Sequence, residues 1–176
     1  DLVPPGTAAA LIVEVDGTPR GVEDDLDQVL DACRAMGARH ITRAATDAER
    51  DAIWAVRRQM SAALKATGLV KVNHDVVVPR GRVPDLFEVI GEIKRTYRLR
   101  VAAFGHAGDG NIHVNLMLTP GDQAERARAA QAERFLFSRV VALEGSISGE
   151  HGIGFAKAPY LSIELSDDEI ALMKRL

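Results

Sequence analysis

The sequence has very little cysteine: Cys33 is the single thiol among its 176 residues. One thiol forms no intrachain disulfide, and it cannot supply the several thiolates of a structural zinc cage. Cys33 falls on the apolar side of an expected helix, where a free cysteine behaves as a small hydrophobic side chain. These observations favour a reducing compartment, so we expect a cytoplasmic protein.

Long hydrophobic runs are also missing. No run approaches the roughly 20 apolar residues needed to cross a bilayer. The opening residues, DLVPPGTAAAL, have neither the basic region nor the long apolar core of a signal peptide. We therefore expect no transmembrane segment, while peripheral association with the inner face of a membrane through another domain stays open.

Charge of one sign is not in excess, because 22 lysine and arginine residues oppose 25 aspartate and glutamate residues. The basic residues are scattered along the chain, so the sequence lacks the electrostatic footprint of a nucleic-acid-binding protein. The glycine-rich G-x-G-x-x-G turn of a dinucleotide-binding fold is missing after the first expected strand, where the sequence reads VDGTPRGVED. We expect no nucleic-acid partner and no nucleotide binding by this chain alone.

What is present is the composition of one globular domain, with 47% hydrophobic and 27% charged residues. Two consecutive strands late in the chain favour an α+β fold with a mixed, largely antiparallel sheet and helices packed on one side, related to the ferredoxin-like arrangement. Apolar spacing and capping residues predict helices over residues 22–36, 46–67, 84–97 and 122–143 and from Ser166 onward. Strands are predicted over residues 10–17, 40–45, 70–79, 100–104 and 111–118.

Two imidazoles frame the glycine-rich stretch GHAGDGNIHVN. Alternation of apolar and polar residues in NIHVNLML places His113 and Asn115 on the same face of a strand. The intervening glycines allow a turn tight enough to bring His106 beside His113, and two adjacent neutral imidazoles are candidate ligands for a divalent transition metal. The alternative is a glycine-rich turn with a structural histidine, in which Asp109 is typical of a turn former.

A second unusual stretch, GSISGEHGIG, has four glycines in ten residues and contains the pair Glu150 and His151. Adjacent residues of an extended chain point in different directions. Glu150 can therefore complete a site of two histidines and one carboxylate, while His151 faces a substrate as a base, since a histidine of ordinary pKa suits proton transfer near neutral pH. The alternative is a surface loop in which both side chains are merely solvated.

Arg57 lies at the border of an apolar stripe on the helix predicted over residues 46–67, whereas Arg58 falls on the solvent side. An arginine in this position can reach a cleft and grip a carboxylate at two points, although snorkelling without function remains the alternative. Lys71 can add a second positive charge to the same cleft; taken alone it is a solvated strand end. His40 and His74 have no polar cluster around them in the sequence and are interpreted as surface histidines.

Together, the segments WAVRR, DVVVP, GHAGDGNIHVN and GSISGEHGIG resemble the C-terminal domain of FAD-linked oxidases of the vanillyl-alcohol oxidase superfamily. The resemblance is greatest to the branch that holds the glycolate oxidase flavoprotein subunit, D-lactate dehydrogenases and D-2-hydroxyglutarate dehydrogenase, and it covers nearly the whole chain. It implies a domain, residues 1–176, that caps the substrate over a flavin held by a separate N-terminal FAD-binding domain, which this chain does not contain. The implied reaction is oxidation of a 2-hydroxy acid to a 2-oxo acid.

The resemblance also implies roles for single residues. A divalent metal such as zinc, manganese or iron would hold the 2-hydroxyl group, His151 would be the catalytic base, and a hydride would pass to FAD. The implied partners are the small 2-hydroxy acid, the FAD-binding domain and other oxidase subunits. Two alternatives are a stand-alone metal- or ligand-binding module without redox activity, and a metallohydrolase that activates water. The implied metal ligands are His106, His113 and Glu150, and the implied substrate-binding residues are Arg57, Lys71 and Asn115.

Overall fold

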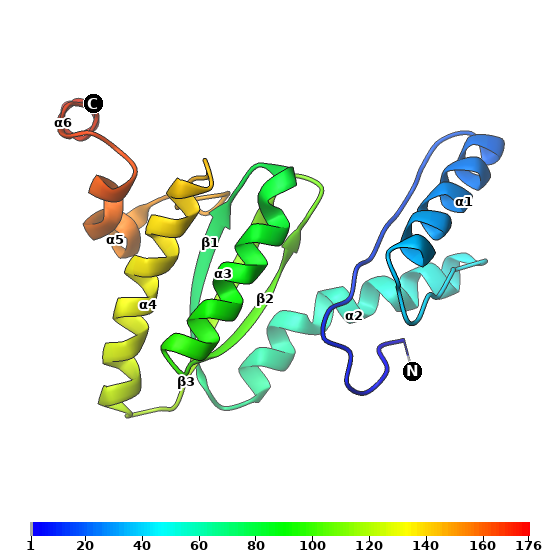
Figure 1. Cartoon of the computed structure of the whole chain (residues 1–176), viewed down its shortest axis with the longest axis horizontal. Coiled ribbons are helices and arrows are strands. Elements are labelled where there is room, and N and C mark those ends of the chain that lie inside the picture. Colours follow the sequence, from blue (N-terminus) through cyan, green and yellow to red (C-terminus); the bar gives the residue numbers. More distant parts are fainter. Residues whose placement is uncertain (1) are drawn as a thin grey trace. The chain divides into compact units, whose positions relative to one another are not determined.

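The computed structural model describes residues 2–176 and confirms the α+β class. The chain divides into two compact units, residues 1–62 and 63–176, and each is considered by itself. The described residues form six α-helices and one three-stranded antiparallel sheet (Figure 1). The whole sheet and four of the helices belong to the second unit, which also contains the end of helix α2 (Asp47–Ala66).

The first unit contains helix α1 (Pro19–Ala35) and most of α2. Thr18 caps α1 through a hydrogen bond from the backbone N–H of Gly21, so the helix starts a few residues before the predicted position. The predicted capping box of α2 is confirmed. The backbone N–H of Glu49 donates to the Thr46 hydroxyl, and the Glu49 carboxylate accepts from the backbone N–H of Thr46.

The prediction of two strands in this unit is wrong. Residues 10–17 and 40–45 adopt no regular secondary structure, and neither segment pairs with a strand among the described residues. An extended apolar segment becomes a strand only when a neighbouring strand accepts and donates its backbone hydrogen bonds. The expected burial is missing as well, because Leu11 is 70% exposed and Val13 is 43% exposed.

The sheet of the second unit has the order β1-β3-β2, with β3 in the centre. Strand β1 (Val70–Val77), β2 (Arg100–His106) and β3 (Asn111–Leu118) match the three strands predicted in this part of the chain. Both neighbours run antiparallel to β3. Helices α3 (Val83–Thr96) and α4 (Gln123–Ala142) lie side by side over one face of the sheet (Figure 1), which confirms the predicted one-sided packing.

The hydrophobic core fills the space between the sheet and these two helices. On β3 it takes the side chains Ile112, Val114, Leu116 and Leu118, the four that alternation assigned to the core. The helices contribute apolar residues at helical spacing, and all of the following are at most 3% exposed: Leu86, Val89, Ile90 and Ile93 on α3, and Ala129, Ala132, Leu136, Phe137 and Val140 on α4. The opposite face of β3 is left for polar side chains.

After α4 the chain returns to the edge of the sheet. Ser146 and Val77 form an antiparallel bridge, which places the glycine-rich loop predicted at 145–154 alongside β1. The loop leads into a short helix, α5 (Gly154–Lys157), and a 3-10 turn, η2 (Ala158–Ile163), neither of which was predicted. Helix α6 (Asp167–Met173) follows with the expected Ser166 cap. No helix within residues 2–176 has the length and apolar character needed to span a membrane.

Gly110, in the turn between β2 and β3, is expected to be important for stability. Gly110 has φ of 81°, and an added Cβ would overlap the carbonyl oxygen of Val78. We expect Gly110→Ala to lower the free energy of unfolding by about 1–3 kcal/mol, because it combines backbone strain with overlap. Gly108→Ala is the matched control, since a Cβ there meets open space. Its effect should stay within about 0.5 kcal/mol. Urea unfolding of both variants measures the difference, and equal losses would contradict this account of Gly110.

Candidate functional site

The face of the sheet opposite the core carries a row of polar side chains from β1 and β3. In the register of the two strands, Asn73 lies opposite Asn115 and Asp75 lies opposite His113. Directly opposed residues of an antiparallel pair have their side chains on the same face. The pairing therefore brings two amides, a carboxylate and an imidazole together.

The β2–β3 hairpin brings the two predicted histidines together, as the sequence indicated. The ring centres of His106 and His113 lie 6.3 Å apart. Asp109 has the role of a turn former, because its carboxylate accepts a hydrogen bond of 3.1 Å from the backbone N–H of Asn111. His113 is buried, at 8% exposure, whereas His106 at the end of β2 is exposed. One histidine is thus held by the sheet and the other stands at its rim.

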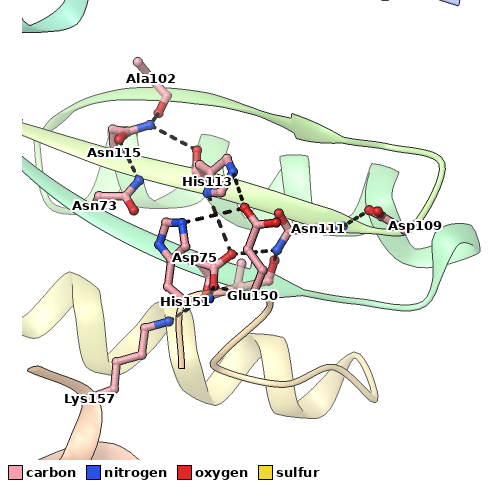
Figure 2. A network of polar contacts seen from close by, with 11 residues as sticks. Asn73, Asp75, Ala102, Asp109, Asn111, His113, Asn115, Glu150, His151 and Lys157 are labelled. Atoms are coloured by element: carbon pink, nitrogen blue, oxygen red, sulfur yellow. Dashed lines mark hydrogen bonds and ion pairs between the residues drawn. The ribbon is translucent and has the colours of Figure 1, made fainter. Parts of the chain in front are cut away.

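The glycine-rich loop places Glu150 and His151 over the same imidazole (Figure 2). The Glu150 carboxylate lies 3.4 Å from Nε2 of His113, and the His151 ring stacks on the His113 ring at 5.3 Å between centres and 22° between planes. The expected divergence of the two side chains is wrong, since Nε2 of His151 is only 3.6 Å from the Glu150 carboxylate. The reason is local, because the chain is bent and not extended at residues 149–151, so the alternation of an extended chain does not apply here.

Asp75 connects this loop to the sheet and was not among the predicted site residues. Its side chain is 1% exposed. One carboxylate oxygen accepts the backbone N–H groups of Glu150 and His151, both at 2.8 Å, and the other accepts the Asn111 amide at 2.6 Å (Figure 2). Burial alone would raise the pKa of Asp75, but the hydrogen bonds from Asn111, His151 and Glu150, together with the charge of Lys157, bring it below its ordinary value.

Two overlapping groups of side chains on this face have metal-ligand atoms within 4.8 Å of one another, and both include His113. The first adds His106 and Glu150, and the second adds Asp75 and His151. The chemistry of these side chains favours the first group, His106, His113 and Glu150, as the metal site. Both oxygens of Asp75 already accept hydrogen bonds, whereas the side chain of Glu150 is 54% exposed. Two imidazoles and a carboxylate form a donor set that suits zinc, manganese or iron.

Asn115 and Lys71 lie on the same face, farther from the loop. Asn115 is fully buried, and its side-chain amide forms hydrogen bonds within the sheet. It accepts from Asn73 at 2.8 Å and donates to the carbonyl oxygens of Ala102 and His113 at 3.1 Å each. Lys71 is half-buried and shares the alternation of Asn73 and Asp75, four residues or about 13 Å along β1 from Asp75. Contact of either residue with a substrate stays a prediction.

Arg57 belongs to the first unit, whereas the sheet belongs to the second. It is half-buried on α2, whereas Arg58 is exposed, as the predicted apolar stripe requires. Arg58 donates to the carbonyl oxygen of Asp51 at 3.3 Å. The helix face is therefore confirmed, and the role of Arg57 in binding a carboxylate stays a prediction.

The interpretation of His74 as a surface histidine is wrong, because it is 6% exposed on the core side of β1. Its ring packs edge-on against Phe137, and its Nε2 lies 3.6 Å from the carboxylate of Glu133. Glu133 also accepts a hydrogen bond of 2.9 Å from the hydroxyl of Tyr160. The polar partners of His74 come from elements far along the chain, so its sequence neighbours gave no sign of them. His40 is exposed, as expected.

A cavity of about 250 Å³ adjoins the candidate site, between β1 and the segment that follows the glycine-rich loop. Its wall includes Asn73, Asp75 and His151 together with the buried Lys157. The Lys157 ammonium donates to the carbonyl oxygen of Asp75 at 2.6 Å, and burial lowers its pKa. Alternation along VKVNHDVV, applied as it was to NIHVNLML, would have found Asn73 and Asp75. Lys157 has no comparable signal.

The chain is similar in sequence to a known protein family and to several known proteins. The model of the family "FAD linked oxidases, C-terminal domain" matches residues 1–176. Glycolate oxidase subunit GlcD of Bacillus subtilis is 33% identical over 99% of this chain and 37% of its own length, and GlcD of Escherichia coli K12 is 35% identical over 95% and 34%. A D-lactate dehydrogenase of Anaerostipes hadrus is 30% identical over 94% of this chain and 35% of its own length. The chain thus spans about a third of these relatives.

Proposed function

Because the chain belongs to the family of FAD linked oxidases, C-terminal domain, we propose that it is the substrate- and metal-binding domain of an FAD-dependent 2-hydroxy-acid dehydrogenase or oxidase of the glycolate or D-lactate type. The observation that carries the proposal is the convergence of His106, His113 and Glu150 within 4.8 Å, with His151 stacked on His113. The reaction is the oxidation of a 2-hydroxy acid to a 2-oxo acid.

His106, His113 and Glu150 hold a divalent metal in this proposal. These residues would hold zinc, manganese or iron, and such an ion would supply polarisation of the substrate's 2-hydroxyl group, which favours deprotonation. Two neutral imidazoles and one carboxylate would be an incomplete ligand set for such an ion, so a substrate oxygen could bind to it as well. The half-exposed side chain of Glu150 can adjust to the ion, while the buried His113 fixes its position on the sheet.

His151 acts as the base that takes the hydroxyl proton. Its ring packs against His113, so it lies next to the ligand set, and its side chain is 54% exposed and open to a substrate from outside. Its backbone N–H is fixed by Asp75. A base must lie within hydrogen-bond reach of the proton that it removes, and the stacked arrangement supports this role.

Arg57 and Lys71 bind the substrate carboxylate in the proposed enzyme, and Asn115 is a further polar contact. The guanidinium fork of Arg57 suits two-point recognition of a carboxylate. Lys71 is supported by its position on the polar face of β1. The amide of Asn115 already has partners in the sheet, so its contribution is to fix this face unless the substrate displaces one of them.

FAD is the electron acceptor and is held mainly by an N-terminal FAD-binding domain of the full-length protein. When bound, FAD would supply the acceptor for the hydride from C2 of the hydroxy acid. The partners of this chain are then the small acid substrate, the flavin domain and other oxidase subunits. We place the protein in the cytoplasm, with peripheral attachment to the inner face of the membrane as the alternative.

Metal binding is the first test of this proposal. We expect calorimetric titration of metal-stripped protein with Zn²⁺ or Mn²⁺ to give one site. The double variant His106→Ala, His113→Ala should have an affinity for the metal more than about 100-fold lower. Loss of a residue that only supports a ligand already lowers metal affinity by up to about 100-fold. His40→Ala is the matched control, since His40 is exposed and bonded to Thr42. Identical titrations of wild type and the double variant would show that the ligand assignment is wrong.

A second test compares two adjacent arginines in the full-length enzyme. Arg57→Ala should lower kcat/KM for the hydroxy acid by an amount that corresponds to about 2–4 kcal/mol of lost transition-state stabilisation, because a charged partner of the carboxylate is lost. Arg58→Ala should have far less effect, since Arg58 is exposed. Steady-state kinetics measure both, and equal effects would mean that α2 presents a different face to the substrate.

A third test separates Glu150 from His151. His151→Asn should leave the metal bound and slow flavin reduction by roughly 10²- to 10⁴-fold, because the base is removed. Glu150→Gln should lower metal occupancy and activity together, since an amide is the poorer ligand for these cations. Stopped-flow flavin absorbance and metal analysis by mass spectrometry distinguish the two. His151 is not the base if His151→Asn reduces flavin at the wild-type rate or loses metal as Glu150→Gln does.

A further inference from the structure

A buried carboxylate that is assigned neither to the metal nor to the substrate lies at the centre of the candidate site. Asp75 is 1% exposed and lies opposite His113 in the β1–β3 register. A buried carboxylate is costly unless it is paired or accepts several hydrogen bonds. Asp75 accepts three, from two different parts of the chain, and none of the three donors is a side chain assigned to catalysis.

The donors show which segments Asp75 joins. The backbone N–H groups of Glu150 and His151 lie 75 and 76 residues away in the sequence, and both donate to a single oxygen of Asp75. The Asn111 amide donates to the other oxygen from the first residue of β3. The backbone of Asp75 takes part too, because its carbonyl oxygen accepts from Gly149 at 3.3 Å and from Lys157 at 2.6 Å. Asp75 thus holds both ends of the segment that carries Glu150 and His151.

Asp75 also faces the buried histidine. The Nδ1 atom of His113 lies 3.7 Å from the Asp75 carboxylate, and the Nε2 atom of the same ring lies 3.4 Å from Glu150 (Figure 2). A negative charge on the Nδ1 side favours the tautomer with its proton on Nδ1. The lone pair of Nε2 is then on the side of the ring that lies near Glu150. Carboxylates placed in this way behind a metal-binding histidine orient the ring and raise its basicity.

We propose that Asp75 is the positioning residue of this site: through its side chain it fixes the backbone of Glu150 and His151 against β1 and orients His113 toward the metal position. The functional consequence rests on the proposed metal- and substrate-binding role, whereas the anchoring of the loop does not. The fit is tight, because a Cβ added at Gly149 would lie 2.7 Å from the Asp75 carboxylate. A longer or differently bonded side chain at position 75 therefore moves the loop.

The test uses the full-length protein with Asp75→Asn, and Asp168→Asn as the control at an exposed carboxylate on α6. In Asp75→Asn, one oxygen can still accept the two loop N–H groups, but the new amide faces the Asn111 amide, donor against donor. We expect amide hydrogen exchange at Glu150 and His151 to become at least about 10-fold faster, while exchange across α3 stays unchanged. Affinity for Zn²⁺ alone should fall by about 10- to 100-fold. Asp168→Asn should match wild type in both.

A rescue variant separates positioning from a general loss of stability. Asp75→Asn combined with Asn111→Asp restores a donor and an acceptor between positions 75 and 111. We expect it to recover slow exchange in the loop, although the weak bond from Asn111 to the Val76 carbonyl at 3.3 Å is lost. Should Asp75→Asn not fold, Asp75→Glu replaces it. Glutamate keeps the charge and lengthens the side chain against Gly149, so the same faster exchange and weaker Zn²⁺ binding are expected.

Three results would overturn the proposal. The first is that the Asp75 variant has the amide exchange rates and the Zn²⁺ affinity of wild type. The second is that exchange becomes faster by the same factor in the loop and across α3. The third is that the rescue variant does not recover slow exchange in the loop. The two levels of inference fail separately. If wild type binds no Zn²⁺ and oxidises no 2-hydroxy acid, the proposed function is wrong, and the exchange measurements still decide whether Asp75 anchors the loop.

Discussion

The antiparallel pairing of β1 with β3 is the constraint on which the rest of the second unit depends. Strand β3 is hydrogen-bonded on both sides, and all eight of its residues are buried. Because side chains alternate along a strand, a shift of the register by one residue would send His113 and Asn115 into the apolar core and expose Val114. The free energy gained by burying the apolar residues therefore also fixes where the polar ones lie.

That register explains why the site is built from two kinds of residue. Asp75, His113 and Asn115 are buried and bonded within the sheet, so their positions are set by folding itself. His106 at the end of β2 and Glu150 and His151 on the glycine-rich loop are exposed, so their side chains can adjust to a ligand. A rigid base with adaptable side chains above it is typical of sites that bind a metal and a small substrate.

The sequence predicted most of the second unit, because its elements are defined by local patterns. Alternation in NIHVNLML identified β3 and the direction of His113, and the glycines of the hairpin identified the approach of His106. The predictions failed where the outcome depends on a distant partner. The apolar segment at 10–17 is not a strand because no strand pairs with it among the described residues, and His74 is buried because Phe137 and Glu133 meet it from α4. Alternation along β1 marks Asp75 as a residue of the polar face, but its role as an anchor of the loop depends on hydrogen-bond donors that lie 36 to 76 residues away.

The side of the site that faces away from the sheet is exposed to solvent, and this exposure affects the proposed chemistry. The side chains of Glu150 and His151 are each 54% exposed, and water at this surface weakens every charge interaction with a substrate. Proton removal from a hydroxyl group by a histidine is favoured where water is excluded and the polar groups are already oriented. The sheet supplies the orientation through the buried Asp75 and His113, but it does not cover the site. In the proposed enzyme, water must therefore be excluded from Glu150 and His151 by a part of the protein other than the sheet and the loop that carries them.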